Sequence, residues 1–277
     1  MEVIIPGKHK KAVHPIAIFK ESWGICWKNL GKLSVIYLIF NLPLAVIYLT
    51  PMASKLHNQK PSFSMLIWIL PVLIISIWGH VALLLGSKKA IDLEVYTIGQ
   101  SIVQVKNFIL KYLGTILSVL LFFMGVVILG GVSTAIILAL LLKVNKILAI
   151  SICLALIIAI LVFSIYFMLR WSLASIVCVL ENARPFSALK RSFVLVTDYV
   201  HPVVGIFCLT ILAYIVCILP FIIIGAFLGV GNDTDQANKI GTIYSLVINI
   251  ILVPLWTIIT VVLYRKLKEA LETNVCA

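Results

Sequence analysis

Long runs of uncharged apolar residues dominate this chain and set the strongest limit on how it folds. Segments such as 147–169 and 203–229 exceed the roughly 18 uncharged residues that mark a membrane-spanning helix. The composition agrees, because 62% of the 277 residues are hydrophobic and 12% are charged. A soluble domain is about half apolar and about a quarter charged. We therefore predict an all-α integral membrane protein.

The apolar runs predict six membrane-spanning helices separated by short polar segments. The expected spans are 33–50, 66–86, 110–130, 147–169, 203–229 and 241–264. The stretch 131–142 allows two interpretations: it continues the third helix past a kink at Gly130–Gly131, or it folds back as a separate segment. Six spans leave both termini on the same side of the membrane.

The basic residues are concentrated on one side of this arrangement. Of the 22 Lys and Arg residues, 17 lie before residue 33, within 87–111, within 170–200 or after residue 264. Loops with excess Lys and Arg stay on the cytoplasmic side of a membrane. We therefore expect both termini in the cytoplasm. The net charge of +12 does not indicate nucleic-acid binding, because the lysines lie at the ends of apolar runs.

Three segments, centred on Ser22, Ser101 and Ser192, share one apolar pattern. Apolar residues recur at offsets −6, −3, +1, +4 and +8 from each serine, which places them on one helical face. Each segment precedes two expected spans, and Gly114 and Gly205 share offset +13. We predict three repeats of an interfacial amphipathic helix plus a helical hairpin within a single polytopic domain, 1–277. The repeat units are about 15–90, 91–180 and 181–270.

A helix with one apolar stripe and a basic polar face is typical of segments that lie in the membrane interface. In the third copy we expect the stripe to lie against the membrane; it comprises Phe186, Leu189, Phe193, Val196 and Val200. Basic side chains there meet anionic headgroups at about 1 kcal/mol each. The candidate lipid-binding or partner-binding residues are Lys20, Arg170, Glu181, Arg184, Lys190 and Arg191. Alternatively, these helices are elbows that anchor the spans following them.

The third copy and the residues before it also carry a recognisable motif. It consists of Arg170-Trp-Ser-Leu-Ala, then Glu181, then Ala188-Leu-Lys-Arg-Ser192. This motif resembles one region of bacterial six-span membrane proteins, among them YciC-like families of unassigned function. It is also similar to the membrane domain attached to some glycerophosphoryl diester phosphodiesterases. The resemblance implies an integral protein of the bacterial inner membrane and no established activity, because that catalytic domain is soluble and separate.

The residues of this motif also suggest a local structure. Arg170 ends the fourth span, where a long basic side chain can extend to the interface. Pro185 is suited to the first turn of the helix that follows. Glu181 precedes that helix and is favoured by its dipole, with Arg170 or Lys190 as a candidate partner. This pattern fits two roles. The residues form a structural clamp that joins the fourth span to the surface helix, or they form a binding site for a ligand or a lipid headgroup.

The sequence contains no recognisable catalytic or cofactor-binding motif. HExxH, GxSxG and the phosphate-binding GxxxxGK[ST] pattern are all missing from it. Among the histidines, only His80 lies inside an expected span, and its helix places no acidic residue beside it. The six cysteines include no CxxC pair, so we interpret them as reduced apolar residues. We expect no enzymatic activity, no cofactor and no metal.

Two main functions remain open from the sequence. The leading one is a scaffold, lipid-interacting module or accessory, whose partners are anionic membrane lipids and another membrane protein or a second copy. The alternative is a transporter or channel for a small or amphipathic solute, with a cavity lined by Asn41, His80 or Asn249. Two features are compatible with transport: polar residues lie inside the expected spans, and prolines interrupt three of them, at Pro43, Pro220 and Pro254. A membrane enzyme acting on lipid is a third possibility.

Overall fold

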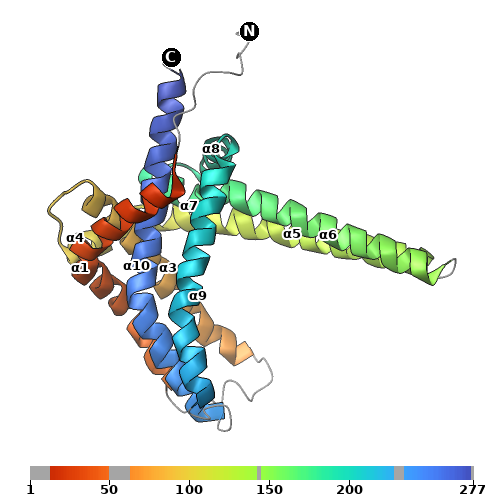
Figure 1. Ribbon diagram of the computed structural model, residues 1–277, viewed down its shortest axis with the longest axis horizontal. Coiled ribbons are helices and arrows are strands. Elements are labelled where there is room, and N and C mark those ends of the chain that lie inside the picture. Colours follow the sequence, from red (N-terminus) through yellow and green to blue (C-terminus); the bar gives the residue numbers. More distant parts are fainter. Residues whose placement is uncertain (1–12, 50–62, 142–144, 228–233, 276–277) are drawn as a thin grey trace. The chain divides into compact units, whose positions relative to one another are not determined.

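The described part of the chain is helical throughout its regular structure, as expected. The computed structural model describes residues 13–49, 63–141, 145–227 and 234–275. Its helices are α1 (Pro15–Leu49), α3 (Phe63–Ile91), α4 (Ile98–Gln104), the 3-10 helix η1 (Val105–Asn107), α5 (Ile109–Leu141), α6 (Lys146–Trp171), α7 (Ala174–Leu180), α8 (Pro185–Thr197), α9 (Val200–Phe227) and α10 (Thr234–Val275) (Figure 1).

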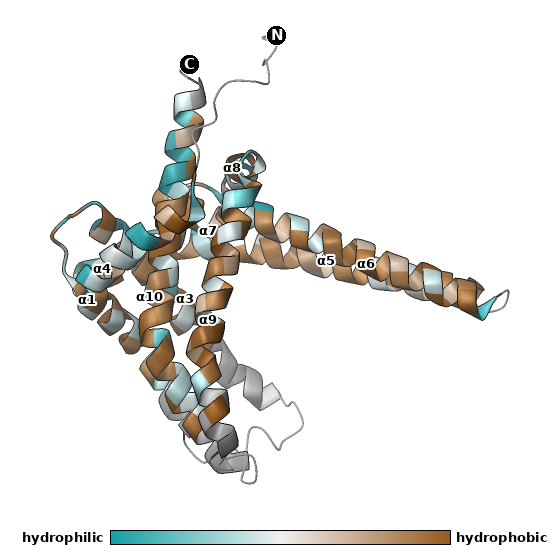
Figure 2. Ribbon diagram, viewed as in Figure 1, coloured by the Kyte–Doolittle hydropathy of each residue, from teal (hydrophilic) through white to brown (hydrophobic). Residues whose placement is uncertain are grey.

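Five helical segments within the described residues are long and apolar enough to cross a membrane. They are Pro71–Ile91, Ile109–Leu141, Lys146–Leu180, Val200–Pro220 and Ile240–Thr273. Each overlaps one of the last five expected spans, and Figure 2 shows apolar residues along α5, α6 and α9. The first expected span, 33–50, lies in α1 apart from residue 50, which is outside the described residues. That span is not among the five, so the count of six stays a prediction.

The stretch after Gly130–Gly131 continues the third helix, which is one of the two interpretations that the sequence allows. The helix α5 runs without interruption from Ile109 to Leu141. A Cβ atom on Gly130 would lie 2.6 Å from Cδ1 of Ile160 in α6. The glycine therefore allows close approach of two helices, a common use of small residues in membrane bundles. The prolines also leave their helices continuous, since α1, α9 and α10 run through Pro43, Pro220 and Pro254.

The three surface segments form different local structures. The first is the N-terminal part of the unbroken helix α1 rather than a separate helix. The second is α4 followed by η1, and α4 begins with a capping box between Thr97 and Gln100. The third is α8, in which Pro185 stands in the first turn as expected.

The chain divides into two compact units. One comprises residues 1–110 and 201–277, and the other comprises residues 111–200. In the first unit the fully buried side chains include residues of α1, α3, α9 and α10, among them Leu33, Leu83, Ile206, Ile259 and Leu263. In the second unit the buried residues centre on α7, where Ala174 and Ile176–Val179 are all buried, and on the inner face of α8. The divisions fall inside the expected second and third repeats.

The apolar stripe expected to lie against the membrane is largely packed against protein. The three aligned serines, Ser22, Ser101 and Ser192, are each 0% exposed. At offset +4 the residues are buried in every copy: Cys26 is 4%, Val105 0% and Val196 0% exposed. At offset −6 they are exposed in every copy: Ile16 is 74%, Val95 98% and Phe186 78% exposed. In the first copy Trp23, at offset +1, is also exposed, at 42%. Apolar character alone does not distinguish a position that faces lipid from one in the protein interior.

Two glycines at offset +13 make the same kind of contact, one in each unit. A Cβ on Gly114 would lie 2.9 Å from Cγ of Pro185, and one on Gly205 would lie 2.8 Å from Cγ of Pro15. Both prolines stand at offset −7 from their serines and begin their helices. In both cases, the glycine lets the apolar helix that carries it pack closely against the proline in the first turn of a surface segment.

Gly114→Ala should destabilise the protein, whereas Gly125→Ala should not. The added methyl at position 114 overlaps a proline ring, and overpacking of this kind costs about 1–3 kcal/mol. Position 125 of the same helix has open space, so the alanine there gains helix propensity of about 1 kcal/mol. Thermal unfolding of the detergent-solubilised protein measures both. Equal melting temperatures for the two variants would contradict the contact.

Candidate functional site

Arg170 and the residues around it join the spanning helix α6 to the surface helix α8. The side chain leaves the last turn of α6 and is 9% exposed. Its guanidinium carbon lies 4.9 Å from the ring centroid of Tyr166 and 4.8 Å from that of Phe193. Its Nη1 donates a hydrogen bond to the Thr197 hydroxyl. Cation–π contacts of a desolvated guanidinium are worth about 2 kcal/mol or more. We call this set of residues the Arg170 junction.

The backbone of Arg170 is also tied to α8. The Ser192 hydroxyl donates to the Arg170 carbonyl oxygen at 2.8 Å. The last carbonyls of a helix have no partner inside the helix, so this bond satisfies one of them. The Thr197 hydroxyl in turn donates to the Phe193 carbonyl at 2.6 Å. Side chain and backbone of one residue therefore hold α8 at the end of α6.

No carboxylate neutralises the Arg170 charge within the described residues. The three ion pairs described there are Arg191–Glu181, Arg265–Asp92 and Lys266–Glu21. The Nε atom of Arg170 is buried without a hydrogen-bond partner. The charge is met by two aromatic faces and a hydroxyl, which is an arrangement that suits a clamp.

The other candidate residues of the surface segments lie at the periphery of α8 or on α1. Glu181 forms an ion pair with Arg191, with its Oε1 3.7 Å from Nε, rather than the expected pair with Arg170 or Lys190. Arg184 is the N-cap residue of α8 and Lys190 projects from its outer face, and both side chains are exposed. Lys20 is exposed on α1.

The candidate cavity residues do not meet in a cavity among the described residues. The Asn41 amide donates to the Tyr37 carbonyl of its own helix at 2.9 Å. The Asn249 amide donates to the Ser245 hydroxyl at 3.1 Å, and its Oδ1 accepts from the Tyr214 hydroxyl at 3.3 Å. Tyr214 belongs to α9, so Asn249 does bond a neighbouring helix, as expected. His80 lies half-buried in α3, and none of the cavities described below is lined by these three residues.

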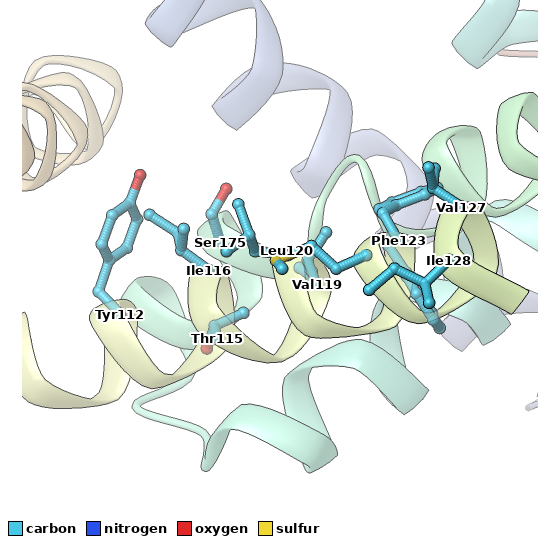
Figure 3. Close-up of a pocket in the computed structure, with 12 residues that line it drawn as sticks. Tyr112, Thr115, Ile116, Val119, Leu120, Phe123, Val127, Ile128 and Ser175 are labelled. Atoms are coloured by element: carbon cyan, nitrogen blue, oxygen red, sulfur yellow. The ribbon is translucent and has the colours of Figure 1, made fainter. Parts of the chain in front are cut away.

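A groove along α5 in the second unit was not anticipated from the sequence. Its volume is about 670 Å³. Its lining is apolar except at one end and consists of Tyr112, Thr115, Ile116, Val119, Leu120, Phe123, Met124, Val127, Ile128, Trp171, Ala174 and Ser175 (Figure 3). Trp171 forms part of the wall and is held edge-to-face by Phe122, 4.6 Å away between ring centroids. The groove thus has a rigid aromatic side at the Arg170 junction.

The polar end of the groove lies at the start of α5. Tyr112 is 5% and Thr115 1% exposed, and in Figure 3 the labelled Ser175 stands across from them on the neighbouring helix. The Thr115 hydroxyl donates to the Lys111 carbonyl at 2.9 Å. The Lys111 ammonium donates to the Asn182 side chain at 2.7 Å and to its carbonyl at 3.3 Å. Asn182 has a positive φ of 54°, a conformation that asparagine adopts more readily than most residues.

Smaller cavities complete the described set. One of about 400 Å³ continues along α5 and α6 between Gly130 and Leu161. Another, of about 150 Å³, lies in the first unit between α9 and α10 beside Tyr214 and Trp256. Both are lined mainly by apolar side chains; the polar lining residues are Thr134 in the first cavity and Thr210 and Tyr214 in the second.

Cysteine and acidic residues do not gather into a metal-binding group within the described ranges. No cluster of three or more His, Cys, Asp or Glu residues occurs there. The described cysteines are all free thiols, and Cys276 lies outside the described residues. Burial raises the pKa of the Cys26 thiol to about 11, so this thiol stays neutral at physiological pH.

Sequence signals for some of these residues were present but weak. Tyr166 stands one helical turn before Arg170, a spacing that places their side chains on one face. Phe193 and Thr197 come from another helix, so only the fold brings them to Arg170.

No protein-family model, curated protein or solved structure matches the chain.

Arg170→Lys should lower the melting temperature, although it keeps the charge. Lysine lacks the flat guanidinium that lies against two rings and binds the Thr197 hydroxyl, so we expect a loss of about 2 kcal/mol. Arg184→Lys, at an exposed position, is the control and should stay within about 0.5 kcal/mol. Thermal unfolding followed by tryptophan fluorescence compares them. If the Arg170→Lys variant melts with the wild type, the guanidinium contacts do not hold the junction.

Ser192→Ala tests the backbone half of the junction. Removing the hydroxyl leaves the Arg170 carbonyl without its bond, at a cost of about 1 kcal/mol. Ser187→Ala, on the exposed face of the same helix, should have no measurable effect. The same thermal unfolding measurement applies, and an effect of Ser187→Ala as large as that of Ser192→Ala would argue against a specific bond.

Proposed function

We propose that this protein is a non-enzymatic integral membrane protein of a bacterial cytoplasmic membrane that binds anionic lipid headgroups through its surface segments and acts as a scaffold or accessory module. The observation that carries the proposal is α8. It is pinned through buried Arg170 and Ser192 to the end of a spanning helix, and it keeps Arg184 and Lys190 exposed. A helix held in this way presents basic side chains at a fixed depth, where headgroups lie.

The proposal includes six spans, cytoplasmic termini and three repeats. The distribution of Lys and Arg supports the orientation, because the ends of the chain and the segment holding α8 are the basic ones. The repeats are supported by the burial of all three aligned serines and by the recurring glycine–proline contact. Parallel repeats of this kind place every surface segment on one side of the membrane.

The transport alternative has less support. The amide groups of Asn41 and Asn249 bond within their own helix or to the adjacent one, and they line none of the described cavities. Polar residues inside spans that are satisfied by neighbouring helices serve packing. The non-enzymatic assignment rests on the sequence, which offers no nucleophile with an adjacent base.

Charge reversal on α8 should reduce the retention of anionic lipid. Arg184→Glu with Lys190→Glu reverses two exposed charges, whereas Arg191 is left unchanged because it is paired with Glu181. At about 1 kcal/mol for each basic residue near the surface, we expect phosphatidylglycerol retention to fall at least about tenfold. Native mass spectrometry of the purified protein, after exchange into detergent with equal amounts of phosphatidylglycerol and phosphatidylcholine, measures it.

The control is charge reversal at the other end of α6. Lys146 is exposed there, and Lys146→Glu changes the charge without touching α8. This variant should retain phosphatidylglycerol like the wild type. A double variant that keeps as much phosphatidylglycerol as Lys146→Glu would rule out headgroup binding by α8 and with it the proposed function.

A further inference from the structure

We propose that the groove along α5 is a binding site for one acyl chain of an anionic phospholipid, with the phosphate at the polar end beside Lys111. This inference rests on the proposed function, since it names where a bound lipid would sit, but it concerns residues separate from the exposed face of α8. The ligand class is a membrane phospholipid taken from the surrounding leaflet. Four features of the second unit lead to this assignment.

The size and lining of the groove match a lipid chain. A volume of about 670 Å³ falls in the usual range of ligand sites, roughly 300–1,000 Å³. The groove extends from Tyr112 to Ile128, or about 24 Å at 1.5 Å per residue. Half of the hydrocarbon core of a bilayer is about 15 Å thick, so the groove can accommodate an acyl chain over the whole depth of one leaflet.

The polar end occupies positions that are purely apolar in the other two aligned segments. Offsets +11 and +14 from the aligned serines hold Leu33 and Ile36 in the first segment and Val203 and Ile206 in the third, all 0% exposed. In α5 the same offsets hold Tyr112 and Thr115, which are 5% and 1% exposed.

The Thr115 hydroxyl bonds the Lys111 carbonyl of its own helix, so a hydroxyl is accommodated at a position that is aliphatic in the other two segments. The two hydroxyl-bearing residues lie at the end of the groove, where the chain of a lipid joins its headgroup.

The charge at this end is positive. The Lys111 ammonium is held by two oxygens of Asn182, and neither of the bonded atoms is a carboxylate. A phosphate diester complements this charge. An apolar helix bound in the groove would leave this positive charge without a counter-charge. We therefore assign the groove to an anionic amphiphile.

Photocrosslinking can test the site directly. The probe is phosphatidylglycerol with a diazirine on one acyl chain, diluted into phosphatidylcholine nanodiscs that contain the full-length protein. Irradiation followed by peptide mass spectrometry should place the label on residues 112–128. Ile116→Trp with Leu120→Trp fills the groove, and we expect labelling of this segment to fall at least about tenfold, which corresponds to 1.4 kcal/mol of lost binding.

The matched control changes the same helix one position further on. Leu117 and Leu121 are exposed apolar residues that do not line the groove, so Leu117→Trp with Leu121→Trp should leave labelling unchanged. Lys111→Gln provides a second test that leaves the groove volume intact, and it should reduce labelling by the phosphatidylglycerol probe but not by a phosphatidylcholine probe. Size-exclusion chromatography and thermal unfolding verify that each variant is folded.

Two outcomes would overturn the inference. Equal loss of labelling in both tryptophan pairs, or none in either, would mean that the probe reports ordinary surrounding lipid. Crosslinks from a photoreactive amino acid at position 116 to peptides within 13–110 or 201–275 would mean that another part of the chain covers the groove. Neither result contradicts headgroup binding by α8. If charge reversal on α8 reduces phosphatidylglycerol retention while labelling of the groove is unchanged, the two sites are supported independently.

Discussion

The absence of water from the hydrocarbon core is the constraint on which the rest of the structure depends. Each backbone group placed there needs a partner within the protein, and an unbroken helix supplies one for nearly every residue. This explains why α1, α9 and α10 continue through internal prolines and α5 through two adjacent glycines. The same constraint leaves the ends of the helices as the places where polar side chains are needed, and the Arg170 junction lies at such an end.

The junction satisfies two requirements with one residue. The end of α6 has a carbonyl to satisfy, and the chain has to turn from a spanning helix into a surface helix. Ser192 bonds the carbonyl, while the guanidinium reaches Thr197 and lies against the rings of Tyr166 and Phe193. Since Ser192 and Thr197 are both on α8, this helix cannot slide or rotate without breaking these contacts.

The fold class and the positions of most helices follow from the sequence because apolar length and helix-start residues are local properties. Pro185 begins α8 for this reason, and the last five spans lie where the apolar runs predict them. The burial of Leu189 and Val196 did not follow, because an apolar side chain suits lipid and protein interior alike. The sequence leaves the stretch after Gly130 open for a related reason: a glycine that weakens an isolated helix also lets Ile160 of α6 come close.

The candidate sites show the same difference between local and non-local information. Lys190 is exposed on the outer face of α8, as the spacing of the apolar residues predicts, and Arg184 is exposed at the N-cap position before the first turn. The ion pair between Glu181 and Arg191 depends on the turn before α8, and the groove depends on how α7 is set against α5, which no periodicity encodes.

The polar character of Tyr112 and Thr115 becomes informative only through the repeat alignment. At the matching offsets, the other two aligned segments carry aliphatic residues. Under the proposed repeat, the other two segments serve as an internal reference, and the departure at Tyr112 and Thr115 is the reason to test ligand binding there first.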